Sequence, residues 1–473
     1  MLRLVPLLAL LALCASVPTA SAQQSADPNC FTADPPAVTK PAHAVRFGIT
    51  PGEAGSVGTG QASAVPQDPE RTLAALRDLR PDAKALVMRL NRLFWADGDD
   101  GIRRFAELTD RYAAAGFQVE SQVRYHPPAG KEGDIPAWED YVRAVARELG
   151  KRPALTALSI TNEGNYDGSS NTSDGAYEGV VEALVRGVIV AREELDAMGR
   201  RDVQLGFAVM WRWRPDNDRR FWEQIGTLAD ANPAFRPALD YVGLQIYPGL
   251  VWPPMKRPGV TAGDEVAEAM TLLRHCYMPK AKLGFEVDTW ISENGYATNL
   301  GRSEDSQVAD LQSTLDAVHK WSGELGISDY RYFNLRDNDS DGADLFSAVG
   351  LLRDDYSPKP AFTTYGGVIA EKGTAPRPPL GPPPLTSTPG TDDRSASPTG
   401  LRVRTRRRGR RTIVVRGRVL GGPCRGTVRI RVGRRVRRAK VRRDCTFRLR
   451  ARIARRRTAV TVSRGRVVVK RRV

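Results

Sequence analysis

The sequence is poor in the residues that metal and thiol chemistry use. It has four histidines and five cysteines in 473 residues, and the histidines lack the spacing of a zinc ligand set. No G-x-S-x-G motif is present, and Cys276 lies in the helical stretch TLLRHCYMP rather than at the end of a strand. These absences argue against a serine or cysteine nucleophile, and we expect no metal and no other cofactor.

Long apolar runs are also missing after the N-terminus. Residues 1–22 combine Arg3, an apolar run and an Ala-Ser-Ala cleavage motif at residues 20–22, which is typical of a secretory signal peptide. No later stretch approaches the roughly 18 apolar residues of a membrane helix. We therefore expect a mature protein that begins with an N-terminal segment, residues 23–43, and is secreted, either extracellular or associated with the cell wall.

The cysteines that remain after the signal peptide are Cys30, Cys276, Cys424 and Cys445. Their number is even, as expected in an oxidising compartment. Cys424 and Cys445 lie close together in the C-terminal region, so we predict a disulfide between them. Cys30 and Cys276 could pair only if the fold joins the N-terminus to the end of a distant helix.

Acidic residues are almost absent from the C-terminal region. Residues 401–473 contain 30 Lys and Arg but a single acidic residue, Asp444, giving a charge of +29. Residues 1–400 contain 41 basic and 53 acidic residues, giving −12. The intervening residues 373–400 are rich in Pro, Ser and Thr and cannot build a core. We predict two domains of opposite charge joined by a linker.

The large domain, residues 44–372, alternates short β-branched runs with longer amphipathic ones, the pattern of βα units. Helical periodicity is clearest at 135–150, 176–199 and 306–321, and Ser173 and Asp174 offer start signals for the second of these. Eight candidate strands cover residues 44–50, 84–90, 117–123, 154–160, 203–209, 240–246, 288–292 and 328–335. Eight units predict a (β/α)8 TIM barrel. A doubly wound sheet is disfavoured, because no G-x-G-x-x-G loop follows the first strand.

Two glutamates stand where candidate strands end. Glu163 follows the fourth strand in SITNEGNY, and Glu293 ends the seventh in WISENGYAT. Because the carboxyl ends of barrel strands share one mouth, both carboxylates should face it. Such a pair suits retaining glycoside hydrolysis, in which an acid protonates the leaving oxygen and a carboxylate attacks the anomeric carbon. Taken alone, Glu163 could instead be a solvated loop carboxylate.

The segments TNE and ISENGYA, with residues 330–362 after them, resemble the retaining glycoside hydrolases of clan A, the 4/7 superfamily. The likeness covers roughly residues 44–372. It implies that Glu163 is the general acid/base, that Glu293 is the nucleophile, and that Asn162 donates a hydrogen bond to the sugar 2-hydroxyl.

The same resemblance implies supporting roles for three further residues. Arg89 and Tyr247 would orient Glu293 and keep it ionised, and His126 would line the substrate subsite. The residues by themselves leave alternatives open: an internal ion pair for Arg89, plain packing for Tyr247 and a loop cap for His126. Two departures from the family concern the subsites, since Gln245 replaces a common His and YRYFNLRDN lacks a Trp.

Three tryptophans, Trp211, Trp213 and Trp252, follow the fifth and sixth strands. Sugar-binding clefts use flat rings at such positions, although core packing is the default for at least one of them.

The basic region alternates Arg with apolar residues in runs such as TVRIRV and CTFRLRARI, the pattern of strands with one buried face. We predict a small all-β, sandwich-like domain that relies on its disulfide. So basic a surface should bind an anionic cell-surface or extracellular polymer. Phe447 is its single aromatic residue, which argues against sequence-specific nucleic-acid binding. Alternatively, the Arg faces are merely solvated.

Together these features predict a secreted retaining glycoside hydrolase, cleaving β-linked poly- or oligosaccharide and tethered to an anionic surface. The alternative is a non-catalytic glycan-binding or adhesion protein on a TIM-barrel scaffold.

Overall fold

The computed structural model describes residues 34–52, 65–81, 83–212, 215–251, 257–376, 400–407, 412–420, 427–432, 435–442, 445–452, 459–464 and 467–472. The chain divides into two compact units, Met1–Leu380 and Gly381–Val473, and each is described by itself. The predicted signal peptide and most of the predicted linker lie outside the described residues, so the limits of these segments stay predictions.

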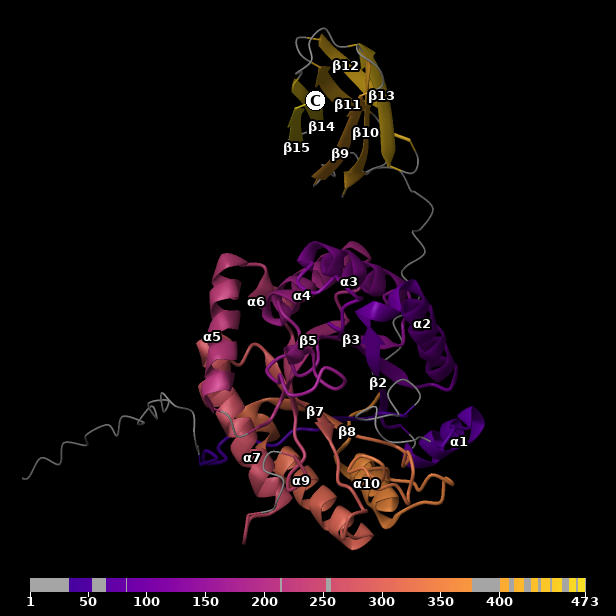
Figure 1. Cartoon of the computed structure of the whole chain (residues 1–473), viewed down its shortest axis with the longest axis vertical. Coiled ribbons are helices and arrows are strands. Elements are labelled where there is room, and N and C mark those ends of the chain that lie inside the picture. Colours follow the sequence, from indigo (N-terminus) through magenta and orange to yellow (C-terminus); the bar gives the residue numbers. More distant parts are fainter. Residues whose placement is uncertain are drawn as a thin grey trace, which may run out of the picture. The chain divides into compact units, whose positions relative to one another are not determined.

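The first unit is a closed barrel of eight parallel strands that neighbour one another in sequence order (Figure 1). Closure is made by β8 against β1, where Gly48 is paired with Arg331. The strands are β1 Arg46–Ile49, β2 Val87–Phe94, β3 Gln118–Arg124, β4 Leu155–Ile160, β5 Gln204–Met210, β6 Tyr241–Gln245, β7 Asp288–Asn294 and β8 Ile327–Tyr332. This confirms the predicted (β/α)8 barrel.

Helices surround the barrel (Figure 1). Amphipathic spacing explains their packing: in α3, apolar residues at three- and four-residue intervals from Ile135 to Leu149 are buried, and Asp134 caps the first turn by accepting from the Ala137 amide. The helices are α1 Pro69–Leu79, α2 Gly98–Ala114, α3 Ile135–Leu149, α4 Val180–Ala197, α5 Pro215–Ala231, α6 Phe235–Ala238, α7 Ala262–Leu272, α8 Met278–Lys280, α9 Glu304–Leu325 and α10 Pro360–Lys372, with short turns η1 Trp95–Asp97, η2 Asp174–Ala176 and η3 Leu273–Tyr277.

The start predicted for the helix after β4 is wrong. Helix α4 begins at Val180, and its N-cap is Gly179 in the left-handed conformation, φ +78°. Ser173 and Asp174 lie earlier and are fully buried. Their side chains bond to Glu163 and Arg124 instead, because a buried carboxyl group and a buried guanidinium are stronger partners than helix amides exposed to water.

The barrel interior is charged where such barrels usually hold bulky aliphatic side chains. Asp329 on β8 accepts from Arg46 Nε at 2.6 Å and from Arg331 Nη2 at 2.7 Å. Arg331 Nε also donates to Glu120 on β3 at 2.8 Å. Both Glu120 and Arg331 are completely buried, so each depends on its partners for the solvation that water would otherwise supply.

The chain of charges continues from Glu120 towards the carboxyl ends of the strands. Arg89 on β2 lies 3.5 Å from Glu120 through Nε and donates to Glu293 on β7 through Nη1 at 2.5 Å. Opposite charges therefore alternate through the barrel, and the last of them is Glu293, one of the two candidate catalytic residues.

A stacked aromatic pair is also buried on neighbouring barrel strands. The rings of Tyr241 and Trp290 stack with centroids 3.4 Å apart, and the Arg331 guanidinium lies 5.1 Å from the Trp290 ring. This contact places a cation over the face of an indole, which is an attractive arrangement.

The second unit is a two-sheet sandwich, as predicted. One sheet has the order β13-β10-β9 and the other β12-β11-β14-β15. The strands are β9 Gly400–Arg407, β10 Thr412–Leu420, β11 Thr427–Val432, β12 Arg435–Lys440, β13 Thr446–Arg452, β14 Ala459–Arg464 and β15 Val467–Arg472. Ile413 and Phe447 of one sheet share a core with Ile430 and Val462 of the other.

Two of the four cysteines considered for disulfides lie within the described residues. These two, Cys276 and Cys445, are each disulfide-bonded. Cys30 and Cys424 lie outside the described residues, so both pairings stay predictions.

Within the described ranges, no helix is both long and apolar enough to cross a bilayer.

Replacing Glu120 should destabilise the barrel strongly. Glu120→Gln leaves Arg89 and Arg331 buried with fewer negative partners, and we expect the free energy of unfolding to fall by about 3 to 5 kcal/mol. Urea unfolding measures this loss. The matched control is Glu194→Gln, which removes the surface partner of Arg147 and should cost less than about 1 kcal/mol. Equal losses in the two variants would show that the buried chain of charges does not stabilise the barrel.

Candidate active site

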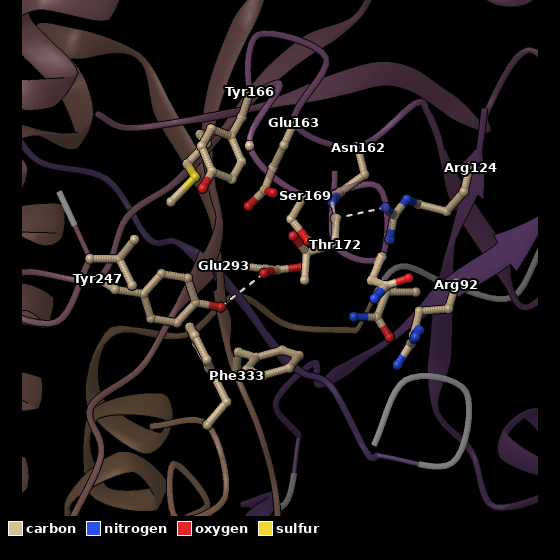
Figure 2. A pocket seen from close by; sticks show the side chains of 16 residues that line it. Arg92, Arg124, Asn162, Glu163, Tyr166, Ser169, Thr172, Tyr247, Glu293 and Phe333 are labelled. Atoms are coloured by element: carbon tan, nitrogen blue, oxygen red, sulfur yellow. Dashed lines mark hydrogen bonds between the residues drawn. The ribbon is translucent and has the colours of Figure 1, made fainter. Parts of the chain in front are cut away.

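A cavity of about 380 Å³ opens at the carboxyl ends of the strands. Both sequence-predicted glutamates, Glu163 and Glu293, line it, and Figure 2 shows their carboxyl groups in its centre. Its other walls are Asn91, Arg92, Arg124, Asn162, Tyr166, Gly168, Ser169, Asn171, Thr172, Met210, Tyr247, Val251, Phe333 and Phe346. The prediction that strands four and seven deliver two carboxylates to one mouth agrees with this arrangement.

Glu163 reaches the cavity through a strained turn. Directly after β4, Thr161 and Glu163 adopt positive φ angles of 67° and 48°, which side chains other than Gly and Asn rarely tolerate. Such strain is concentrated at functional sites. Glu163 is 7% exposed, and Ser173 Oγ donates a hydrogen bond to its Oε2.

The protonation of Glu163 follows from this setting. Burial raises the pKa of its carboxyl to about 8, and the negative charge of Glu293 acts in the same direction. Ser173 and Arg124 offset part of the increase. Glu163 therefore holds its proton near neutral pH, as a general acid must.

Glu293 is held from two sides by donors. Arg89 Nη1 donates to Oε1 at 2.5 Å. Tyr247 Oη donates to Oε2 at 2.8 Å (Figure 2). Burial and Glu293 raise the pKa of Tyr247 well above its usual value, so the phenol keeps the proton that it donates. These contacts fix the orientation of the carboxylate and give each of its oxygens a hydrogen-bond donor.

For Arg89 and Tyr247, the sequence left open a purely structural role, and the structure gives each residue both a structural contact and a bond to Glu293. Arg89 is fully buried and forms an internal ion pair with Glu120, yet the same guanidinium also bonds to Glu293. Tyr247 packs edge-on against Phe346, with ring centroids 5.5 Å apart, and its hydroxyl bonds to Glu293. Each residue is both structural and part of the site.

Asn162 lies in the cavity wall with a fixed amide. Its Oδ1 accepts from Gln122 at 2.8 Å and from Gln245 at 2.5 Å, and its Nδ2 donates to the Thr172 carbonyl at 2.8 Å. Gln245, noted in the sequence as a departure from a common His, thus orients Asn162.

The loop between β4 and α4 is locked over the site by one buried carboxylate. The Asp174 carboxylate accepts hydrogen bonds from Arg124 Nε at 2.9 Å, from the backbone amide of Tyr125 at 2.7 Å and from the backbone amide of Asn162 at 2.8 Å. Arg124 also donates to the Thr172 carbonyl at 2.6 Å. Sequence reasoning missed this loop, although the polar run GSSNTSDG, residues 168–175, which begins five residues after Glu163, was a usable signal.

Two of the remaining predicted subsite residues, His126 and Trp211, do not line the cavity. His126 bonds to the Tyr177 hydroxyl at 2.9 Å and packs against Phe94, and it is not part of the cavity wall. Trp211 is half-buried against the barrel core. Trp213 and Trp252 lie outside the described residues.

Aromatic rings nevertheless line the cavity, at positions that the sequence did not suggest. Phe333, directly after β8, and Phe346 form part of one wall, and Tyr166 forms part of another. Phe333 lies in the stretch YRYFNLRDN, which lacks a Trp, and its smaller ring was not a comparable signal in the sequence.

The residues that the structure describes contain no group of three or more His, Cys, Asp or Glu side chains that could hold a metal ion.

Comparisons with known proteins give structural similarity without sequence similarity. No protein-family model and no curated protein matches the sequence. A β-glucosidase structure is 17% identical, with 64% of this chain and 88% of that chain covered and a TM-score of 0.44. GH5_18 from Streptomyces cattleya in complex with GlcNAc is 16% identical, with 71% and 83% covered and a TM-score of 0.45.

A third structure is GH5_18 from Bifidobacterium longum subsp. longum, as a variant in complex with Manβ1-4GlcNAc. It is 14% identical, with 70% of this chain and 80% of that chain covered and a TM-score of 0.46. Similarities at these identities do not assign an activity, so the function has to be argued from the site itself.

The raised pKa of Glu163 should make stability depend on pH. Its carboxyl has an ordinary pKa of 4.5 and a folded-state value of about 8. Between these values the folded protein binds the proton more tightly than the unfolded chain, so the free energy of unfolding falls as pH rises. We expect Glu163→Gln to remove a fall on the order of a few kcal/mol.

Urea unfolding at several pH values from about 4.5 to 8 checks this expectation. Glu107→Gln, an exposed carboxyl on α2, is the matched control and should follow the parent. A constant difference between Glu163→Gln and the parent at every pH would contradict a buried, proton-holding Glu163.

Proposed function

We propose that the protein is a secreted retaining glycoside hydrolase that cleaves β-linked O-glycosidic bonds in a poly- or oligosaccharide. The observation that carries the proposal is the asymmetry of the two carboxyl groups in one cavity. Burial keeps Glu163 protonated, whereas Arg89 and Tyr247 donate hydrogen bonds to the two carboxylate oxygens of Glu293. An acid beside a carboxylate is the pair that glycosidic cleavage requires.

In the first step, Glu163 gives its proton to the glycosidic oxygen as a carboxylate oxygen of Glu293 attacks the anomeric carbon. The bond from this carbon to the leaving oxygen breaks, and a covalent glycosyl ester forms on Glu293. In the second step, Glu163 removes a proton from water, and the water oxygen displaces Glu293 from the anomeric carbon. Two inversions give net retention.

The charge coupling between the two glutamates suits this exchange of roles. The negative charge of Glu293 helps to raise the pKa of Glu163. Once Glu293 is esterified, that charge is gone, and the pKa of Glu163 falls. Glu163 is therefore protonated when an acid is needed and more readily ionised when a base is needed.

The walls support a sugar as the bound group. Phe333, Phe346 and Tyr166 offer flat apolar surfaces, which suit the apolar faces of pyranose rings. Asn162, with its amide fixed by Gln245, is suited to bond the sugar 2-hydroxyl next to the anomeric carbon.

A non-catalytic glycan-binding barrel is the alternative, and the buried charges weigh against it. Two coupled carboxyl groups and an arginine are costly to desolvate, and a binding surface has no need of a carboxyl group whose pKa is shifted to about 8. Catalysis explains why they are kept together.

Tethering to an anionic polymer forms the second part of the proposal. On one face of the sandwich, Arg429 of β11 is paired across the strands with Arg438 of β12, and both are exposed. Arg431 and Lys440 extend the exposed basic face along the same two strands. Like charges directly opposite each other are destabilising, and a bound polyanion relieves that repulsion.

Catalysis is tested by separating the roles of the two glutamates on a panel of aryl glycosides and natural oligosaccharides. Glu293→Gln should show no measurable turnover on any substrate, because the nucleophile is lost. Glu163→Gln should lose about 10² to 10⁴ in rate on substrates with poor leaving groups and far less on activated aryl glycosides. Proton NMR of the first product should show retained anomeric configuration.

Glu107→Gln is the control for this test and should match the parent. Parent-like rates for Glu293→Gln would refute the nucleophile assignment, and binding without hydrolysis by the parent would favour the glycan-binding alternative.

Tethering is tested on the full chain by elution from an immobilised acidic polysaccharide. Arg429→Gln with Arg438→Gln should elute at clearly lower salt, since each lost contact lowers a salt-dependent affinity. The double variant Arg103→Gln with Arg104→Gln removes two exposed arginines of α2 and should elute with the parent. Equal shifts in the two double variants would indicate a general charge effect and no binding face.

A further inference from the structure

Strand β2 carries an irregularity at the cavity that the proposed mechanism does not use. Leu90 pairs with Ser121 of β3 and Leu93 pairs with Val123, with a register shift between them. Asn91 and Arg92 therefore lie opposite the single residue Gln122, which is the arrangement of a β-bulge.

The bulge changes the direction of one side chain. In a regular strand, consecutive side chains point to opposite faces, yet Asn91 and Arg92 both line the cavity. Arg92 achieves this with a left-handed backbone, φ +72°, a conformation that is unfavourable for a long side chain. Bulges beside active sites commonly re-aim a side chain, and strain of this kind persists where the surroundings impose it.

The surroundings hold the Arg92 side chain against an aromatic ring. The guanidinium groups of Arg92 and Arg124 each lie 5.4 Å from the centroid of Phe94. Figure 2 shows the two arginines on one side of the pocket, with Tyr247 on the opposite side and the two glutamates between them.

The guanidinium groups of Arg92 and Arg124 both belong to the cavity wall. Arg92 adds a further positive charge, which its surroundings disfavour: burial lowers the pKa of its guanidinium, Arg124 acts in the same direction, and Asp97 offsets only part of the effect. An anion in the cavity beside Arg92 would relieve this cost.

Asn91 provides an independent observation, a buried acceptor without a donor. The residue is 6% exposed, and within the described ranges its Oδ1 accepts no hydrogen bond. A buried acceptor without a donor is unfavourable, and a sugar hydroxyl would supply one.

We propose that the bulge in β2 forms a subsite in which Arg92 binds an anionic substituent of the substrate and Asn91 accepts from a neighbouring sugar hydroxyl. The substrate is then an acidic glycan, carrying a carboxylate, sulfate or phosphate near the bond that is cleaved. This inference rests on the proposed glycosidase function and narrows its substrate class. A guanidinium suits all three anions because its donors form a planar fork.

The test measures binding rather than turnover, so that it is independent of the hydrolysis assays. The full chain carries Glu163→Gln, which prevents acid catalysis and keeps the uncharged state that Glu163 has near neutral pH. Arg429→Gln and Arg438→Gln are included to weaken binding by the basic sandwich. Isothermal titration calorimetry then compares oligogalacturonides, hyaluronan oligosaccharides and sulfated oligosaccharides with neutral cello- and manno-oligosaccharides.

Three variants in this background isolate the subsite. Arg92→Asn removes the charge while Asn tolerates the left-handed backbone. Arg92→Lys keeps the charge but loses the fork, and Arg103→Gln removes an exposed arginine of α2 as the matched control.

We expect at least one acidic oligosaccharide to bind more tightly than its neutral counterparts. Arg92→Asn should weaken that binding roughly tenfold or more, Arg92→Lys should weaken it less, and Arg103→Gln should leave it unchanged. Acidic and neutral oligosaccharides that bind alike would overturn the proposal, as would equal losses for both classes in Arg92→Asn.

Inorganic sulfate alone is the final arm. If it binds in an Arg92-dependent manner and no acidic oligosaccharide does, the site holds a free anion, and the inference about substrate is wrong. Hydrolysis that fails while Arg92-dependent binding of an acidic glycan persists would count against catalysis and not against the subsite.

Discussion

The chain of buried charges through the barrel is the constraint on which the site depends. From Arg46 at one end to Glu293 at the other, each charged group is compensated by a neighbour on a different strand. A buried charge without its partner is strongly destabilising, so these contacts set how the strands lie relative to one another. They also hold Arg89 where it can bond to Glu293. The same contacts therefore stabilise the barrel and position a carboxylate in the cavity.

A second group of contacts works from outside the barrel. Asp174 ties the loop after β4 to Arg124 and to the amide of Asn162, and the adjacent Ser173 bonds to Glu163. The barrel interior thus positions Glu293, whereas the loop positions Glu163. The two carboxyl groups consequently differ in their surroundings, and this difference separates an acid from a carboxylate.

Much of the fold could be predicted because its pattern is local. All eight expected strands form, and β4 at Leu155–Ile160 lies within the predicted 154–160, since apolar runs and turn residues mark such elements directly. The predicted end of β2, residue 90, falls four residues short of Phe94, because a bulge interrupts the alternation on which the prediction relies. Ser173 and Asp174 resemble helix start signals because, in sequence, a cap and a buried hydrogen-bond partner look alike.

The sequence by itself determined the eight-unit barrel, the separate basic β region and the two glutamates at the ends of the fourth and seventh strands. Each of these features can be recognised from periodicity, composition or spacing along the chain. Only the tertiary structure decided which groups surround those glutamates: Ser173 on Glu163, Arg89 and Tyr247 on Glu293, and Arg92 in the cavity wall. The protonation and orientation of these side chains depend on burial and on distances between residues far apart in the chain. Burial and these distances are fixed only when the strands close into a barrel.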